Sequence, residues 1–355
     1  MSNKHKNISY NQNSIPKWWI YVGVTLLLSV FMIGCSRSLP QGCPKDCVAA
    51  DLTGMDLQSM RFIQANLIDA NLSKAKMVRT NLSKADLRGA NLEESDLESA
   101  DLTNALLIGV NLKLTNLRNA RLGGANLSGS NLDNSQLTSV NLSNTNLNGV
   151  SLNGAELVGT ILSGVNLGGV EMIDANLSGA NLYQAILNGA VTTQADFSGA
   201  TLDQAEMNGM QGNLATMIGT ELNNANLSGG TLFGADLTGA NLSNAKLKGA
   251  MLVGANLSGA DLRGADLSGA LLVLPVPPGA PADFSYNNLS GEKLLNAIGN
   301  TSIAKAFYDP IIRDLPESRI YPLLKDTILQ GVLYDDQTTW PLGFSIPDSA
   351  IYTQN

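Results

Sequence analysis

The stretch ANLSGADLRGADLSGA, residues 255–270, shows the five-residue rhythm that decides the fold of this chain. Each unit has a leucine at its centre, a small residue two positions earlier, and asparagine or aspartate between them. From Leu52 to Leu272 the centres recur every five residues without insertion or deletion, in 45 units, and leucine occupies 37 of them. Such a strict period indicates a repeat architecture rather than globular domains. We expect the centres to form the core, as represented by Leu52, Leu72, Leu92, Leu262 and Leu267.

The five-residue period excludes an amphipathic helix. At ~100° per residue, five residues advance by about 140° modulo a turn, so the leucines would spiral around a helix without forming a stripe. In an extended chain the small residue and the leucine have the same parity, so both face inward while their polar neighbours face outward. An odd repeat length would reverse that parity in every unit, so each unit must end in a corner. Glycine suits such corners and occupies 23 of the 45 positions two residues after a centre.

The repeats resemble the A(D/N)LXX motif of the pentapeptide repeat family over residues 50–274. The resemblance implies an all-β fold, a right-handed quadrilateral β-helix in which four units make one square coil of 20 residues. About 11 coils would then stack to ~50 to 55 Å, at ~4.8 Å per strand layer. Each coil would depend on its neighbours alone, and the two open ends would need caps.

Residues 1–34 are typical of an export signal. Three lysines and no acid occupy residues 1–17, and the uncharged apolar run of residues 18–34 precedes Cys35. This pattern indicates a signal peptide, and MIGC resembles a bacterial lipobox in which Cys35 is lipidated. An uncleaved signal anchor is the alternative, because 17 residues at ~1.5 Å each span ~26 Å. Both interpretations predict a membrane-anchored chain on the extracytoplasmic side, periplasmic or lumenal.

Residues 35–49 are predicted to form a linker ahead of the repeats. Cys43 and Cys47 are close enough to pair as a disulfide outside the cytoplasm. A thioredoxin-like redox motif has two residues between its cysteines, whereas three separate these two. We therefore interpret the pair as a structural clip.

The irregular units gather on one side of the expected coil. Met172, Thr192 and Gly212 replace the central leucine at positions that differ by 20, so they stack on one face of a four-sided coil. In the unit of Gly212, Met210 occupies the position that is normally small. We expect Met210 to fill the volume left by the missing leucine. A small ligand-binding cleft on this face is the alternative.

Charge is segregated along the array. Residues 51–121 contain nine acids and nine bases, whereas residues 122–245 contain nine acids and no Lys or Arg. The middle coils should therefore present an Asn/Ser/Gly surface with sparse negative points. That surface is either a solvated exterior or a contact surface for a basic partner or a cation.

The repeats end at a proline-rich linker, residues 275–289. Its prolines cannot donate ladder hydrogen bonds, so the stacking of strands should stop there. Residues 290–355 are predicted to contain short α-helices that fold over the open end as a cap. Within them, LYDDQTTWPLGF (333–344) resembles a tailpiece that follows pentapeptide arrays in bacterial, especially cyanobacterial, proteins. We expect it to pack along the rod or the cap.

Composition argues against an enzyme. The chain has one histidine, His5, which lies ahead of the repeats, so a Ser/His/Asp or Cys/His arrangement in the folded part is excluded. Four Cys or His ligands for a structural zinc are also lacking there, and we expect neither a metal nor a cofactor. The net charge of −8 gives no general attraction to nucleic acid or to anionic lipid.

These features together predict a non-enzymatic, membrane-tethered β-solenoid outside the cytoplasm. It would act as a structural scaffold or protein–protein interaction module for an unidentified protein partner. The resemblance supplies an alternative, because some members of the family inhibit DNA gyrase by presenting a rod of DNA-like charge. The sparse acids and the export signal favour the scaffold.

Overall fold

The computed structural model describes residues 38–273, 279–281 and 310–354. The chain divides into two compact units, residues 1–39 and 40–355, and the description below concerns the second. The predicted signal or anchor segment and Cys35 lie outside the described residues. Within the described ranges, no helix is both long and apolar enough to cross a membrane.

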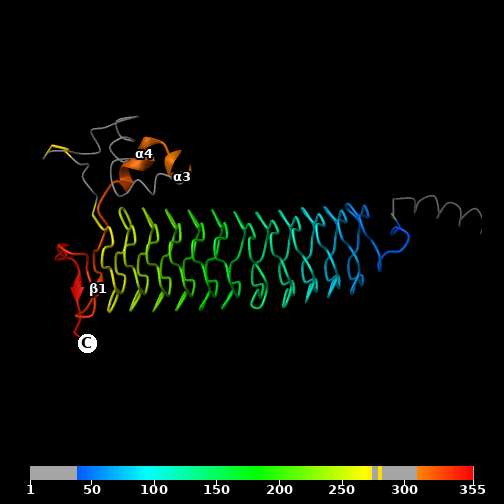
Figure 1. Cartoon of the computed structure of the whole chain (residues 1–355), viewed down its shortest axis with the longest axis horizontal. Coiled ribbons are helices and arrows are strands. Elements are labelled where there is room, and N and C mark those ends of the chain that lie inside the picture. Colours follow the sequence, from blue (N-terminus) through cyan, green and yellow to red (C-terminus); the bar gives the residue numbers. More distant parts are fainter. Residues whose placement is uncertain (1–37, 274–278, 282–309, 355) are drawn as a thin grey trace, which may run out of the picture. The chain divides into compact units, whose positions relative to one another are not determined.

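The repeats wind into a stack of coils (Figure 1). The residue before each centre pairs in parallel with the residue 20 positions later, as Asp51 does with Asn71 and Asn71 with Asn91. Two backbone hydrogen bonds hold each pair: Leu52 N–H donates to Asn71 O at 2.8 Å, and Asn71 N–H donates to Ala50 O at 2.9 Å. Four units of five residues therefore complete one coil, which confirms the expected β-helical architecture.

Each side of a coil ends in a tight turn. Met55 N–H donates to the carbonyl of the centre, Leu52, at 3.1 Å, and Gly54 between them has a φ of 65°. A positive φ at the third residue of a four-residue turn defines type II, which favours glycine. Lys74 adopts the same conformation with a φ of 58°. The inter-coil bonds on both sides of each corner hold non-glycine residues in this otherwise unfavourable region.

The interior contains the centres and the small residues. Leu52, Leu72, Leu92, Leu262 and Leu267 are each 0% exposed. Burying a leucine side chain contributes roughly 1.5–3 kcal/mol, so the axis of the solenoid replaces a globular core. In the first full coil the large side chains of Met55 and Phe62 are also buried, and they fill the interior at that end.

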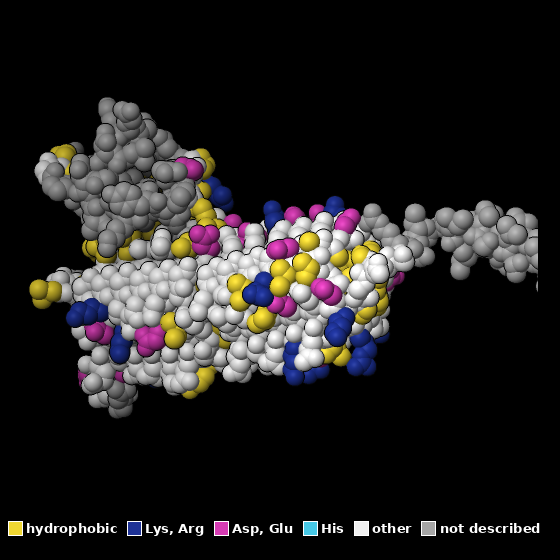
Figure 2. Space-filling model, turned by 45° about the vertical axis from the view of Figure 1, so that its right-hand side comes forward, with side chains coloured by type: hydrophobic (Ala, Val, Ile, Leu, Met, Phe, Trp, Pro, Cys, Tyr) yellow, Lys and Arg dark blue, Asp and Glu magenta, His cyan; other side chains and the backbone are white. Residues whose placement is uncertain are grey.

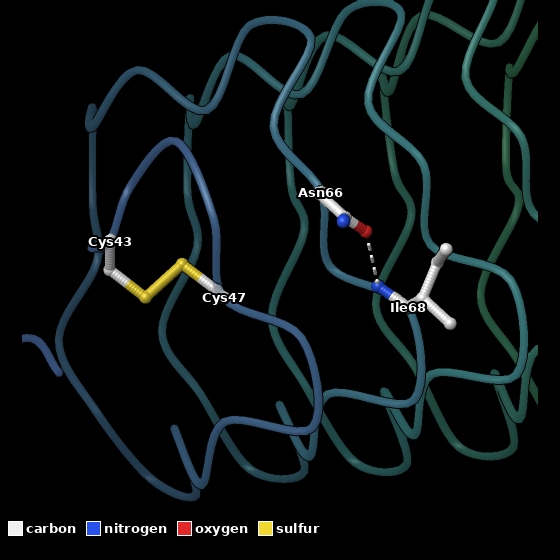
Figure 3. Close-up of a disulfide and its surroundings, with 4 residues drawn as sticks. All are labelled: Cys43, Cys47, Asn66 and Ile68. Atoms are coloured by element: carbon white, nitrogen blue, oxygen red, sulfur yellow. Dashed lines mark hydrogen bonds between the residues drawn. A yellow bond between two sulfur atoms is a disulfide. The ribbon is translucent and has the colours of Figure 1, made fainter. Parts of the chain in front are cut away.

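The array begins one unit earlier than the sequence pattern indicated. Asp46 pairs with Asn66, and Cys47 occupies a buried centre whose N–H donates to Asn66 O at 2.7 Å. A disulfide joins Cys43 to Cys47, beside the turn in which Asn66 accepts from Ile68 N–H (Figure 3). The clip therefore attaches the entering chain to the core of the first unit, and residues 46–49 belong to the solenoid rather than to a linker.

The C-terminal chain closes the other end as a further coil. Ile328 pairs with Asn256, Leu333 with Asp261, and Thr339 with Asp266. Thr338 Oγ1 donates to Leu262 O at 2.9 Å. Threonines two residues before a repeat centre, such as Thr115, make the same bond between coils. The strand β1 (Leu333–Tyr334) lies in this coil and pairs in parallel with β2 (Ile351–Tyr352) (Figure 1). The tailpiece thus continues the solenoid instead of packing along it.

The predicted helical cap is not confirmed: this last coil occupies the end, and residues 290–309 of the predicted cap lie outside the described residues. The helices α3 (Pro310–Arg313) and α4 (Glu317–Ile320) and the 3-10 helix η3 (Tyr321–Leu323) lie beside the coils (Figure 1). Leu323 makes the contact: its Cδ2 lies 2.8 Å from where a Cβ on Gly234 would be. Its carbonyl oxygen lies still closer to the corresponding position of Gly254. Glycine at both corners permits this approach.

One section of the wall, residues 119–171, has an incomplete ladder. The pairing of Asn146 with Asn166, which the 20-residue period requires, is missing from these described residues. Several N–H groups there also lack the inter-coil backbone bond made by their counterparts in other coils. These are the N–H groups of Asn119, Leu122, Gly124, Asn141, Asn144, Leu147, Gly149, Asn166 and Glu171.

Thr145 lies at the centre of this section, two residues before the centre Leu147. It bonds differently from the threonines at the same position of other units. Thr115 Oγ1 donates to Leu92 O of the preceding coil at 2.8 Å, and Thr160 Oγ1 donates to Leu137 O at 2.9 Å. Thr145 Oγ1 donates instead to Leu142 O in its own turn. Its hydroxyl therefore adds no bond between coils at the point where the backbone ladder is weakest.

We predict that Thr115→Ala and Thr145→Ala have different effects on stability. Thr115→Ala removes a bond between coils and should lower the free energy of unfolding by about 1 kcal/mol. Thr145→Ala removes a bond within one turn and should change it by less than about 0.5 kcal/mol. Urea unfolding of both variants measures the difference. Equal losses would mean that the Thr145 hydroxyl also joins coils.

Candidate binding surface

The polar groups of this protein lie on the outer wall of the solenoid. Among residues 38–273, 279–281 and 310–354, no group of three or more His, Cys, Asp or Glu comes together. The two acids Glu93 and Glu94 are adjacent in a turn and lie on the outside.

Asparagine side chains on the wall are largely used by the fold. Asn71 Oδ1 accepts from Ser73 N–H at 3.2 Å, which closes an Asx turn. Asn91 Nδ2 donates to Asn71 Oδ1 at 3.3 Å, and Asn111 Nδ2 donates to Asn91 Oδ1 at 3.1 Å. These amide ladders bind neighbouring coils to each other.

The first coils pair their charges with each other. Arg88 contacts Asp86 at 2.7 Å, Arg121 contacts Asp101 at 3.4 Å, and Lys74 contacts Glu94 at 3.7 Å. The hydrogen bond from the Arg88 side chain holds the pKa of Asp86 below its ordinary value. Such exposed pairs contribute roughly 0–1 kcal/mol each.

The middle coils present carboxylates without basic neighbours in sequence (Figure 2). Glu156, Asp196 and Asp236 lie in one column, because the parallel pairs run from Glu156 through Asn176 and Thr216 to Asp236. Amides hold these carboxylates in place: Asn176 Nδ2 donates to Glu156 Oε2 at 3.0 Å, and Thr238 N–H donates to Asp236 Oδ1 at 3.0 Å. We call this column, from Glu156 to Asp236, the acidic wall.

Met172, Thr192 and Gly212 stack on one face of the coils, where Glu171 pairs with Val191 and Val191 with Gln211. Met210 is buried, and its Cε lies 2.9 Å from where a Cβ on Gly212 would be. Met210 therefore occupies the volume of the missing leucine side chain.

The outward residues of this same face are buried. They follow the centres on the face, at positions that are half-exposed or exposed on most of the wall. Their exposed fractions are 0% for Thr193, 1% for Asn213, 0% for Phe233 and 0% for Val253. Because Leu323 packs on Gly234 and Gly254 beside them, this face is where the C-terminal chain docks. Sequence reasoning missed this role, although the apolar Phe233 and Val253 at normally polar positions were a signal for it.

A cleft of about 440 Å³ opens between this face and the helical segment. The solenoid forms one wall with corner residues from three successive coils. The helical segment forms the other wall with one residue before α4, one in α4 and one in η3. The lining residues are Asp174, Gln194, Leu214, Leu315, Arg319 and Leu323. The irregular face therefore has both features considered from the sequence, a repacked interior and a cleft on its outer side.

The sequence matches the family described as pentapeptide repeats over residues 46–189, 193–229 and 231–269. HetL, a pentapeptide repeat protein involved in heterocyst differentiation regulation from the cyanobacterium Nostoc sp. strain PCC 7120, is 30% identical. That match covers 66% of this chain and 92% of HetL, with a TM-score of 0.29.

Two further solved structures show a similar match. Rfr23, a pentapeptide repeat protein from the cyanobacterium Cyanothece 51142, is 36% identical over 31% of this chain and 89% of its own, with a TM-score of 0.31. A trypsin-treated form of QnrB1, a plasmid-mediated fluoroquinolone resistance protein, is 19% identical over 55% and 89%, with a TM-score of 0.22. None of the curated proteins compared matches the chain.

The exchange of volume between Met210 and Gly212 is testable by a double-mutant cycle. Met210→Ala alone should cost about 2–5 kcal/mol of stability because it leaves a cavity. Gly212→Leu alone should cost about 1–3 kcal/mol or more because its side chain would meet Met210 and Leu232. The double variant restores the alanine–leucine pair of regular units and should recover most of both losses. Additive losses in denaturant unfolding would contradict the exchange.

Proposed function

This chain belongs to the pentapeptide repeat family, and on that premise we propose that it is a non-enzymatic scaffold that binds a basic protein partner along the acidic wall. The observation that carries the proposal is the column of Glu156, Asp196 and Asp236 in a section of the repeats, residues 122–245, that contains no Lys or Arg. Members of the column are two coils apart, at a spacing of ~10 Å. Because ladder bonds hold the wall rigid, little conformational entropy is lost when a partner binds.

Complementary charge on the partner would direct its approach. The carboxylates of this wall, exposed at Glu156 and half-buried at Asp196 and Asp236, would attract basic surfaces over about a Debye length, ~8 Å at physiological salt. The exposed side chain of Ile218, 43% exposed, lies beside the acidic wall and would supply apolar contact area. A partner bound in this way should dissociate as salt is raised.

The scaffold proposal predicts contacts that depend on the acidic wall. A photo-crosslinking residue at Ser178, next to Asn176 on this wall, should capture a protein partner from native membranes. The double variant Glu156→Lys with Asp196→Lys should reduce that crosslink at least tenfold. The matched control, Asp203→Lys with Glu221→Lys, places the same charges on the neighbouring face and should retain it. Equal loss in both variants, or none in either, would contradict binding at the acidic wall.

We also propose that residues 1–34 export the chain and that Cys35 tethers it to a membrane. Support comes from the sequence alone: the lysines, the apolar run of residues 18–34 and the cysteine that follows. A tether would hold the solenoid at the membrane surface on the extracytoplasmic side. The scaffold would then act on partners near that surface.

The tether predicts a mass and a fractionation. The mature protein should lack residues 1–34 and carry acyl chains, and it should fractionate with membranes. Cys35→Ala should abolish acylation, while Cys43→Ala, as a control, should leave it unchanged. An intact mass that includes all 355 residues would contradict lipidation and favour a signal anchor.

DNA mimicry remains the alternative function. The Lys- and Arg-free section, residues 122–245, favours it because its surface charge is exclusively negative. Inhibition of DNA supercoiling by the purified chain, together with loss of inhibition in the Glu156→Lys/Asp196→Lys variant, would support it over the scaffold.

A further inference from the structure

The cleft beside the irregular face places opposite charges on opposite walls. Asp174 projects from a corner of the solenoid, and Arg319 projects from α4. Among the described residues, neither side chain takes part in an ion pair, although both line the same cleft. A ligand between them would meet a carboxylate on one side and a guanidinium on the other.

Three leucines supply the apolar part of the cleft lining, beside its charged and amide groups. Leu214 and Leu323 close one end, because their Cδ2 atoms lie 3.0 and 2.8 Å from the same point, the position of a Cβ on Gly234. Leu315 lines the opposite end of the helical wall. Between the charges and the leucines, Gln194 supplies an amide that can both donate and accept.

The backbone of the solenoid fixes the length of the cleft on one side. Asp174, Gln194 and Leu214 have φ values of 56°, 61° and 59°, and they stand on three successive coils, about 10 Å from first to last. On the other side, Leu315 precedes α4, Arg319 lies in α4 and Leu323 ends η3, and all three line the cleft. The volume of about 440 Å³ lies in the range of small-molecule sites.

We propose that this cleft binds a small apolar zwitterion, an aliphatic α-amino acid or dipeptide with free amino and carboxyl groups. The ammonium group would face Asp174, and the carboxylate would accept from the Arg319 guanidinium, which suits carboxylates through its paired donors. The aliphatic side chain would lie against Leu214, Leu315 and Leu323 and remove their surfaces from water. Binding would join the helical segment to the solenoid across the cleft.

The test uses the purified full chain and four probes in calorimetric titrations. L-leucine and L-leucyl-L-leucine represent the two sources of the proposed ligand chemistry, and the tighter of the two identifies the size that fits. N-acetyl-L-leucine lacks the ammonium group and L-leucinamide lacks the carboxylate. We expect saturable binding of leucine or the dipeptide, and at least tenfold weaker binding of both blocked probes.

Two variants assign each charge to its wall. Asp174→Asn should bind leucine as weakly as wild type binds N-acetyl-leucine, and Arg319→Gln should bind it as weakly as wild type binds leucinamide. Asp203→Asn changes an acid outside the cleft and should bind as wild type does. The blocked probes test the same charges on the unaltered protein, so the result does not depend on the folding of any variant.

Three results would overturn the proposal. The first is no saturable binding of leucine or the dipeptide up to about 10 mM, a concentration that includes millimolar affinities. The second is equal binding of free and blocked probes, and the third is equal loss in Asp203→Asn and Asp174→Asn. Closure of Asp174 onto Arg319 as an ion pair would produce the first result.

Discussion

The backbone hydrogen bond between one coil and the next is the interaction on which the rest of this structure depends. It pairs each residue before a centre with the residue 20 positions later, so four units must complete each coil. This pairing forces the side-chain parity to restart at every corner, which directs each leucine inward. The apolar axis, the Asx turns and the outward polar columns all follow from it. A chain built in this way is stabilised locally, coil on coil, rather than by one globular core.

The same interaction creates a problem at both ends, where a coil has no neighbour. At the first coil the protein uses large buried side chains, Met55 and Phe62, and a disulfide from Cys43 to the core residue Cys47. At the other end it brings back a distant part of the chain as an additional coil. There Asp335 accepts from Gly264 N–H at 2.9 Å, and Thr338 bonds to Leu262, so polar groups of the last repeats are satisfied. An exposed sheet edge would otherwise invite association with other chains.

The departures from the repeat gather on one face of the solenoid, where the C-terminal chain docks. The face with Thr192 and Gly212 is repacked inside by Met210 and covered outside where Leu323 meets Gly234 and Gly254. Apolar residues at outward positions, Phe233 and Val253, suit a covered face and would be costly on an exposed one. The wall elsewhere keeps its regular polar columns. The proposed scaffold surface and the proposed ligand cleft would use adjoining parts of the same solenoid.

The repeat sequence by itself determined the strand parity, the inward centres and, through the family resemblance, the 20-residue coil. These properties recur every five residues, so each unit of the sequence provides the same evidence for them. The coil formed by the tail is difficult to predict from sequence because its units depart from the repeat motif and are unequally spaced. Each unit keeps only a small residue two positions before a large one: Thr327 and Leu329, Val332 and Tyr334, and Thr338 and Trp340. Pairing of Leu333 with Asp261 joins residues far apart in sequence, and no local pattern encodes it. The tertiary structure alone decided that the tail forms the last coil, that α4 lies beside the coils, and that the ladder is weakest around Thr145, since each depends on which distant backbone groups find partners.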